Sequence, residues 1–553
     1  MSEAISNLVT DTEKQRTNSR SESRNEPVPV RYPSGPVLVI IVIALMLSMF
    51  LASAQYTLGY EWRANFRAYR WRLIWQSIIS TAIPKITVQF KSMDDIGWYG
   101  SAFFLTLAAF QSAWGHIYQG FSLRVSFLVA IAIFEIGSLI CALAPNSIAL
   151  IIGRAIQAFV APPAKVPILI GLLGSTFSVA SIAGPLLGGV FSQHLTWRWC
   201  FYINLPIGGV AAGVLFFFFR TPEQAKSGIG RPLREKLKQF DFIGLAVLLA
   251  GLICFFLALQ WGGVTKPWSD GSVIACLVLW VILTGAFVFI EWWQKDRALM
   301  ALRILKSRNI GACCAFIFFL NAANFSLIYN LPIYFQAING DSPMTSGIKN
   351  IPTILSTSIA TFISSAIVTK IKYYQPFLLA GSILATIGAG LIYTFNLTSG
   401  LGSIIGYQII YGTGTGLSVQ IPVVVAGALS STEDQPITMA TVLFFQFISA
   451  AYGVGSTDSI MNNLLVQSIP RYMEGVGPEE VINAGSSGLQ DVFSGSELLG
   501  ARRSYLNGLH GSWAMGTALF GITFLCAFIP KQGSKIPRPG NRKEDQGNSV
   551  PMA

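Results

Sequence analysis

Charged side chains are scarce in this chain of 553 residues, and histidines are scarcer still. Only 12% of the residues are charged whereas 52% are apolar, and the mean hydropathy is +0.55. A soluble protein of this length would need far more polar surface, so the composition excludes that class. The three histidines form no His-Glu-x-x-His zinc motif, and no Gly-Lys pair is present for a nucleotide-binding loop. We therefore expect no enzyme, no cofactor and no metal.

A disulfide framework is also missing from the sequence. All seven cysteines fall in or at the edges of apolar runs, which predicts that they pack inside the fold. Acidic residues are too few to balance the basic ones, since 38 Lys and Arg face 26 Asp and Glu and leave a net charge of +12. In a membrane protein this excess predicts cytosolic loops beside anionic lipid, and nucleic-acid binding is the weaker alternative.

Long apolar runs fill most of the chain. About fourteen spans of about 20 residues would occupy about half of it, which predicts an all-α membrane protein with about 14 transmembrane helices. Both tails carry Lys and Arg and are expected in the cytosol, so the number of spans should be even. We expect the first three spans at about residues 37–54, 97–115 and 126–144. The fourth should begin near residue 147 and the fifth should end near residue 191. The others are expected at about residues 206–219, 244–261, 271–290, 311–336, 348–368, 376–395, 404–427, 437–460 and 508–528.

The stretch 181–209 has a less common pattern. Gly184 and Gly188 lie four apart on one helix face, where missing side chains let a neighbouring backbone come close in lipid. Pro185 between them can bend the helix, and Gly189 follows directly. Ordinary helix packing is the alternative interpretation of these glycines.

A ring-charge-ring cluster comes next. Trp197, Arg198 and Trp199 suit the headgroup layer, and Asn204 and Pro206 then open another apolar span. Together with the preceding glycines, this turn resembles the end of helix 5, the joining turn and the start of helix 6 in the major facilitator superfamily. The match is to its fourteen-helix drug:proton antiporter branch, and within that branch to fungal secondary-metabolite or toxin efflux pumps.

The resemblance covers about residues 33–530 and implies a domain layout. A disordered cytosolic tail (1–35) should precede an N-terminal six-helix bundle (36–220). A basic cytosolic loop with two extra linker helices (221–308) should lead to a C-terminal six-helix bundle (309–530), before a cytosolic tail (531–553). Members of the family work by rocking the two bundles about a central site.

Two places depart from the family pattern. Helix 1 of the family carries a buried Asp linked with proton coupling, but here that Asp is absent and residues 56–76 stand in its place. A retained intron or faulty gene model would explain this insertion, and a basic amphipathic surface helix is the alternative. In the fourth span, prolines at 162, 163 and 167 predict a shortened or broken helix.

The proton-coupling residues are predicted from one carboxylate and one motif. Glu135 lies inside the third span, where a carboxylate is costly enough to suggest a function. Arg154 and Gln157 match the family's Leu-x-x-Gly-Arg-x-x-Gln-Gly motif, whose buried Arg is linked with proton transfer. A guanidinium there would favour the charged form of a nearby carboxylate. A structural Glu that is hydrogen-bonded between helices is the alternative.

Polar amides mark the predicted substrate pathway. They lie along two apolar spans, where they suit a neutral pathway for an amphipathic substrate, and interhelical hydrogen bonding is the equal alternative. The candidate residues are Asn321, Asn324, Asn330, Gln336 and Gln420.

The resemblance implies a proton-driven exporter of small hydrophobic or amphipathic compounds. Its partners would be a small-molecule substrate, protons and the lipid bilayer, with no nucleic acid, in a monomer placed in the plasma membrane or in a vacuolar or vesicular membrane. Two alternatives stay open. One is a related fourteen-helix carrier of siderophores or another solute, and the other is a transport-defective product of a faulty gene model.

Overall fold

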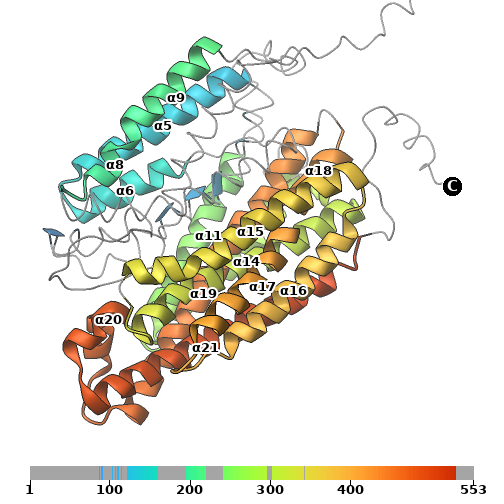
Figure 1. Cartoon of the computed structure of the whole chain (residues 1–553). Coiled ribbons are helices and arrows are strands. Elements are labelled where there is room, and N and C mark those ends of the chain that lie inside the picture. Colours follow the sequence, from blue (N-terminus) through green and yellow to red (C-terminus); the bar gives the residue numbers. More distant parts are fainter. Residues whose placement is uncertain are drawn as a thin grey trace, which may run out of the picture.

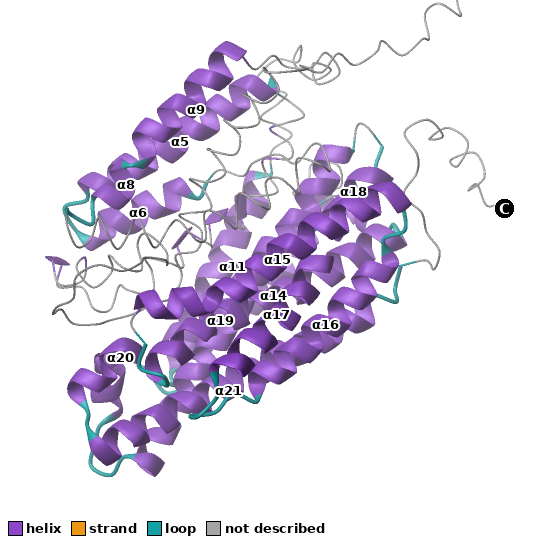
Figure 2. Ribbon diagram, in the orientation of Figure 1, coloured by secondary structure: helices purple, strands orange, loops and turns teal. Residues whose placement is uncertain are grey.

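The structure is a computed structural model that describes residues 121–159, 195–218, 241–294, 300, 302–341, 343–431 and 434–530, with isolated positions between 86 and 117. Regular structure in these ranges is helical apart from isolated bridge residues such as Gly262 and Lys266, which confirms the all-α prediction (Figure 2). The predicted first span, the 56–76 insertion and the motif of Gly184, Pro185, Gly188 and Gly189 lie outside the described residues.

Four described helices form the N-terminal group: α5 (Leu123–Leu143), α6 (Ser147–Gln157), α8 (Trp199–Tyr202) and α9 (Asn204–Phe218). α5 packs against both α6 and α9, and the group stands at the upper left of Figure 1. Asn146 begins α6 by accepting a hydrogen bond from the backbone N–H of Ala149 at 2.9 Å. α6 is only 11 residues long, too short to cross a membrane, in agreement with the predicted shortening.

Two helices between the halves form a hairpin, and we call α11 (Phe242–Trp261) and α12 (Gly271–Gln294) the extra pair. Asp241 links the two helices at the end of the hairpin that lies away from the turn. Its carboxylate accepts hydrogen bonds from the Gly244 N–H at 2.6 Å and from Gln294 Nε2 at 2.7 Å. At the other end, Gly263 takes a φ of +76°, which favours glycine. Hydrogen bonds from Ser272 lower the pKa of Asp270 at the start of α12.

The C-terminal group holds most of the described apolar core. Its long helices pack around α14, α17, α19 and α21. The elements are α13 (Leu302–Leu305), α14 (Arg308–Ala337), α15 (Pro343–Ile371), α16 (Gln375–Tyr393), α17 (Leu401–Ser418), α18 (Ile421–Leu429), α19 (Gln435–Tyr472), α20 (Pro478–Val492) and α21 (Gly495–Cys526).

Glycines let α17 approach its neighbours closely. A β-carbon on Gly412 would lie 2.6 Å from the Thr353 carbonyl oxygen of α15, and one on Gly388 of α16 would lie 2.5 Å from the Tyr411 backbone. Both distances are shorter than side chains tolerate, so glycine is required for this packing. A 2.8 Å hydrogen bond from Thr353 to Gln408 adds a polar link between α15 and α17.

The structure corrects several predicted helix ends. Ten of the described helices are long and apolar enough to span a membrane, and the total of fourteen stays a prediction. The span expected at 437–460 continues to Tyr472, and the one expected at 508–528 begins at Gly495. The span expected at 404–427 is two helices broken at Val419 and Gln420. Pro422 lies in the first turn of α18 and cannot donate a backbone hydrogen bond.

Candidate functional site

A buried polar cluster joins three elements of the N-terminal group. The Ser138 hydroxyl of α5 accepts from Gln157 Nε2 of α6 at 2.8 Å and from Asn204 Nδ2 of α9 at 3.1 Å. All three side chains are buried. Hydrogen bonds of this kind hold helices together in lipid, so Gln157 and Asn204 act here as fixed links between helices.

Arg154 lies at the boundary between the two helix groups. Its side chain is only 1% exposed, and its guanidinium sits 4.8 Å from the centre of the Phe103 ring. Tyr329 of α14 lies within electrostatic reach of the same guanidinium. We call the apolar cluster around it the seam, because it joins the two halves of the chain; it comprises Phe103, Leu107, Ala158, Phe325, Tyr329, Ala450 and Val454.

Glu135 occupies a different place, between α5 and α9. Both of its carboxylate oxygens are buried and have no hydrogen-bond partner among the described residues. The carboxylate fits against Gly208 of α9, where a β-carbon would overlap it. Glu135 therefore faces α9, whereas Arg154 faces Phe103, and the structure does not bring the two together as an ion pair.

The Trp-Arg-Trp turn packs one of its two indoles inside the protein. Trp197 is 3% exposed, donates to Gln89 Oε1 at 2.8 Å and packs edge-on against Phe201, and its place in the headgroup layer stays a prediction. The guanidinium of Arg198 stacks on this ring and donates to the Ala144 carbonyl at 2.9 Å, which ties the turn to the end of α5. Trp199 remains exposed, at 45%.

The amides of α14 divide into two kinds. Asn321 donates to the Ile317 carbonyl of its own helix at 3.3 Å, and Asn324 accepts from the Tyr411 hydroxyl of α17 at 2.7 Å. These two serve helix packing. In contrast, the Nδ2 atom of Asn330 is buried and has no partner within the described ranges, and the same holds for Nε2 of Gln336. Gln420 is half-buried at the break between α17 and α18.

Comparison with known proteins gives the family. The family model described as Major Facilitator Superfamily matches residues 73–454, well over half of the chain. The chain belongs to the Major Facilitator Superfamily. It is thus an integral membrane transporter of small molecules and no enzyme. Solved structures agree on the fold, with a TM-score of 0.52 to the human organic anion transporter MFSD10 (TETRAN) at 12% identity, covering 89% of this chain and 100% of that one. A double-Trp XylE mutant gives 0.53 at 13% identity, covering 90% and 98%.

Curated fungal proteins are more similar in sequence. The MFS-type transporter thnB of Trichoderma harzianum is 39% identical over 91% of this chain and 86% of its own length. The MFS-type efflux pump MFS1 of Trichophyton rubrum is 38% identical over 93% of this chain and 94% of its own. The efflux pump notK of an Aspergillus species is 38% identical over 85% and 86%. The transporter thus resembles fungal efflux pumps along most of its length.

Three further polar side chains of this transporter were not predicted from its sequence. Asp458 lies within the α19 span, and its charge inside an apolar run was the signal that marks it. Gln408 and Gln446 also lie within spans, and each has a buried amide atom without a partner in the described part of the chain. The two glutamines gave no separate signal, because only the packing shows which amides stay unpaired.

Proposed function

We propose that this superfamily member exports small hydrophobic or amphipathic compounds in exchange for protons. The observation that carries the proposal is the Glu135 carboxylate, which is buried beside Gly208 and has no hydrogen-bond partner among the described residues. A charged carboxylate in that position is costly within a membrane, and taking up a proton removes the charge. Efflux pumps among its fungal relatives support the outward direction.

The coupling follows from the cost of the charge. Proton uptake at Glu135 from the outer side neutralises the α5–α9 contact, and proton release to the cytosol restores the charge. If the two conformations of the transporter differ in how well they solvate that carboxylate, protonation shifts the balance between them. Asp458 is the second candidate carboxylate, since it lies within the α19 span.

The seam supplies a surface for an amphipathic substrate. Phe325 and Tyr329 of α14 stack with ring centroids 6.1 Å apart, and both lie among apolar neighbours of the other half. Asn330, with its unpaired Nδ2, lies next to Tyr329 in sequence. Aromatic surface with a few convergent amides is typical of sites for drug-sized ligands. A plasma-membrane location fits export from the cell, and a fluorescent fusion would distinguish it from the vacuolar alternative.

The test is export from vesicles with an imposed pH gradient. Wild type and Glu135→Gln, reconstituted into liposomes, would be loaded with a lipophilic fluorescent dye and compared with and without a protonophore. The wild type should export the dye only while the gradient lasts, and the variant should lose gradient-driven export but keep dye binding. Glu497→Gln, at the start of α21 and outside the apolar run, is the matched control.

Three outcomes would count against the proposal. Full gradient-dependent export by Glu135→Gln would exclude this carboxylate. Export by wild type that ignores the protonophore would exclude proton coupling. A wild type that exports nothing, beside an active version with helices 1 and 4 restored to the family pattern, would identify this chain as a transport-defective product.

A further inference from the structure

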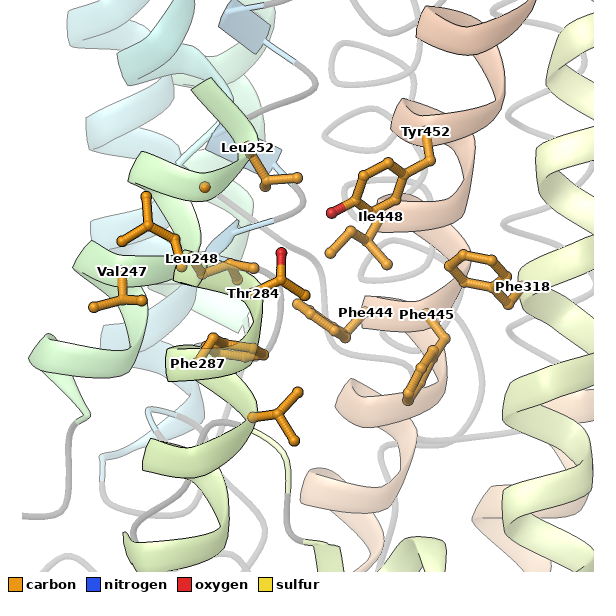
Figure 3. Close-up of a pocket in the computed structure, with 13 residues that line it drawn as sticks. Val247, Leu248, Leu252, Thr284, Phe287, Phe318, Phe444, Phe445, Ile448 and Tyr452 are labelled. Atoms are coloured by element: carbon orange, nitrogen blue, oxygen red, sulfur yellow. The ribbon is translucent and has the colours of Figure 1, made fainter. Parts of the chain in front are cut away.

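An apolar pocket lies between the extra pair and the C-terminal group. One wall comes from α11 and α12, and the other comes from α19 with a contribution from α14. Figure 3 shows Thr284 and Phe287 of α12 pointing toward Phe444 and Ile448 of α19. The cavity volume is about 150 Å³. An apolar cavity of this size excludes water and accepts hydrocarbon.

The pocket offers nothing to a polar ligand. Among its lining residues only Thr284 and Tyr452 carry polar side-chain atoms. The Tyr452 hydroxyl accepts from Trp280 Nε1 at 3.1 Å. A charged or polar molecule would therefore lose its hydration on entry without gaining hydrogen bonds in return.

One side of the pocket is continuous with the outer face of the extra pair. Val288 lines the pocket and is still 52% exposed. On the same helix, Val281, Ile282 and Phe289 are exposed large apolar residues. Because α12 is a membrane span, this face lies against lipid tails, and the pocket opens sideways into the hydrocarbon of the bilayer.

We propose that the pocket binds one acyl chain of a bilayer phospholipid. The lining is apolar except for two hydroxyls, the Tyr452 hydroxyl is already hydrogen-bonded to Trp280, and the hydrocarbon of the bilayer lies at the mouth. An empty cavity would forfeit the dispersion contacts of its walls, whereas an alkyl chain restores them. The acyl chain fills the space between α12 and α19 and contacts both helices. This role does not depend on which substrate is exported or on protons.

The test maps lipid contacts by photocrosslinking. The full-length protein would be reconstituted in phosphatidylcholine vesicles doped with a phosphatidylcholine that carries a diazirine within one acyl chain. After irradiation, mass spectrometry of the peptides should find label on pocket residues of both walls, including Leu252 and Ile448. Lipid that merely surrounds the protein would label the outer face of α12 and leave the α19 wall unlabelled.

Filling the pocket supplies the matched comparison. Thr284→Phe and Val247→Phe each place a ring in the pocket and should reduce labelling of the α19 wall severalfold. Val281→Phe adds the same ring on the lipid-facing side of α12 and should leave that labelling unchanged. Size-exclusion profiles would establish that the variants fold, and the wild-type label map decides the question even if they do not.

Two results would overturn the proposal. The first is absence of label on the α19 wall in the wild type. The second is displacement of that label by a lipophilic dye that the protein exports, because the pocket would then be an entrance for substrate rather than a lipid site.

Discussion

The Glu135 carboxylate leaves no room for a side chain at Gly208. A methyl group there would overlap Glu135, whereas Gly209 on the same helix has open space around its α-carbon. We expect Gly208→Ala to displace the carboxylate and lower gradient-driven export about tenfold, equivalent to about 1.4 kcal/mol of activation free energy. Gly209→Ala should export as the wild type does. Dye efflux from proteoliposomes measures both, and equal rates for the two variants would show that the Gly208 contact has no role.

Asp458 gives a second prediction at the same scale. Neutralising a carboxylate within a span should remove its response to protons, so Asp458→Asn should make the export rate less dependent on external pH. Asp491→Asn, on the exposed α20 segment, controls for the loss of one negative charge. A pH profile of Asp458→Asn that overlays the wild-type profile would assign this residue a packing role.

Individual residues were the hardest part to predict from sequence. The cost of a charge in lipid drew attention to Glu135, but its surroundings could not be foreseen, because its carboxylate lies against Gly208 while Arg154 points to Phe103. The partners of Trp197 could not be foreseen either, because its residue type suggests a place in the headgroup layer but does not identify Gln89 and Phe201 as its neighbours.

At the scale of helices, the close approach of α17 to α15 leads to a testable prediction about packing. Gly412 meets the α15 backbone, whereas Gly406 on the same helix faces open space. Valine at either position changes helix propensity equally, so only the contact differs. Gly412→Val should lower the free energy of unfolding by about 1–3 kcal/mol relative to Gly406→Val. Thermal unfolding in detergent measures the difference, and equal midpoints would contradict the close approach.

Helix identity was predictable, whereas helix ends were not. Apolar runs of span length located the long helices of the C-terminal group correctly. The predicted ends were wrong for α19 and α21, which continue beyond their apolar runs as polar helix. The apolar run ends at the membrane boundary, whereas the backbone hydrogen bonds of a helix can continue past it. The run 404–427 was predicted as one span, and its break at Gln420 was not foreseen, since glycines and a proline do not say on their own where a helix stops.

At the scale of the whole molecule, the extra pair belongs with the C-terminal half. Trp268 donates to Asn463 Oδ1 of α19 at 3.0 Å, and Asn463 Nδ2 donates to the Gly262 carbonyl at 3.1 Å. Farther along, Trp280 of α12 donates a hydrogen bond to the Tyr452 hydroxyl of α19. These links hold the hairpin at two levels, so it should move as one body with α19 while the N-terminal helices rock against it.

Spin labels test this division. In a cysteine-free background, labels at Thr265 and Glu474 should keep a constant distance between acidic and neutral pH. Labels at Thr265 and Asn146 should change theirs by several ångströms, because they lie on opposite halves. Equal changes for the two pairs would show that the extra pair moves independently of α19.

The turn at 262–270 has a practical use that follows from its rigidity. It joins two spans whose other ends carry the basic loops, so it is expected on the side of the membrane away from the cytosol. Gly263 and Asn463 hold its backbone in one shape. An antibody fragment raised against this turn would bind a fixed epitope in every conformation, and would give a small membrane protein the mass and outline that electron cryomicroscopy needs to align its particles.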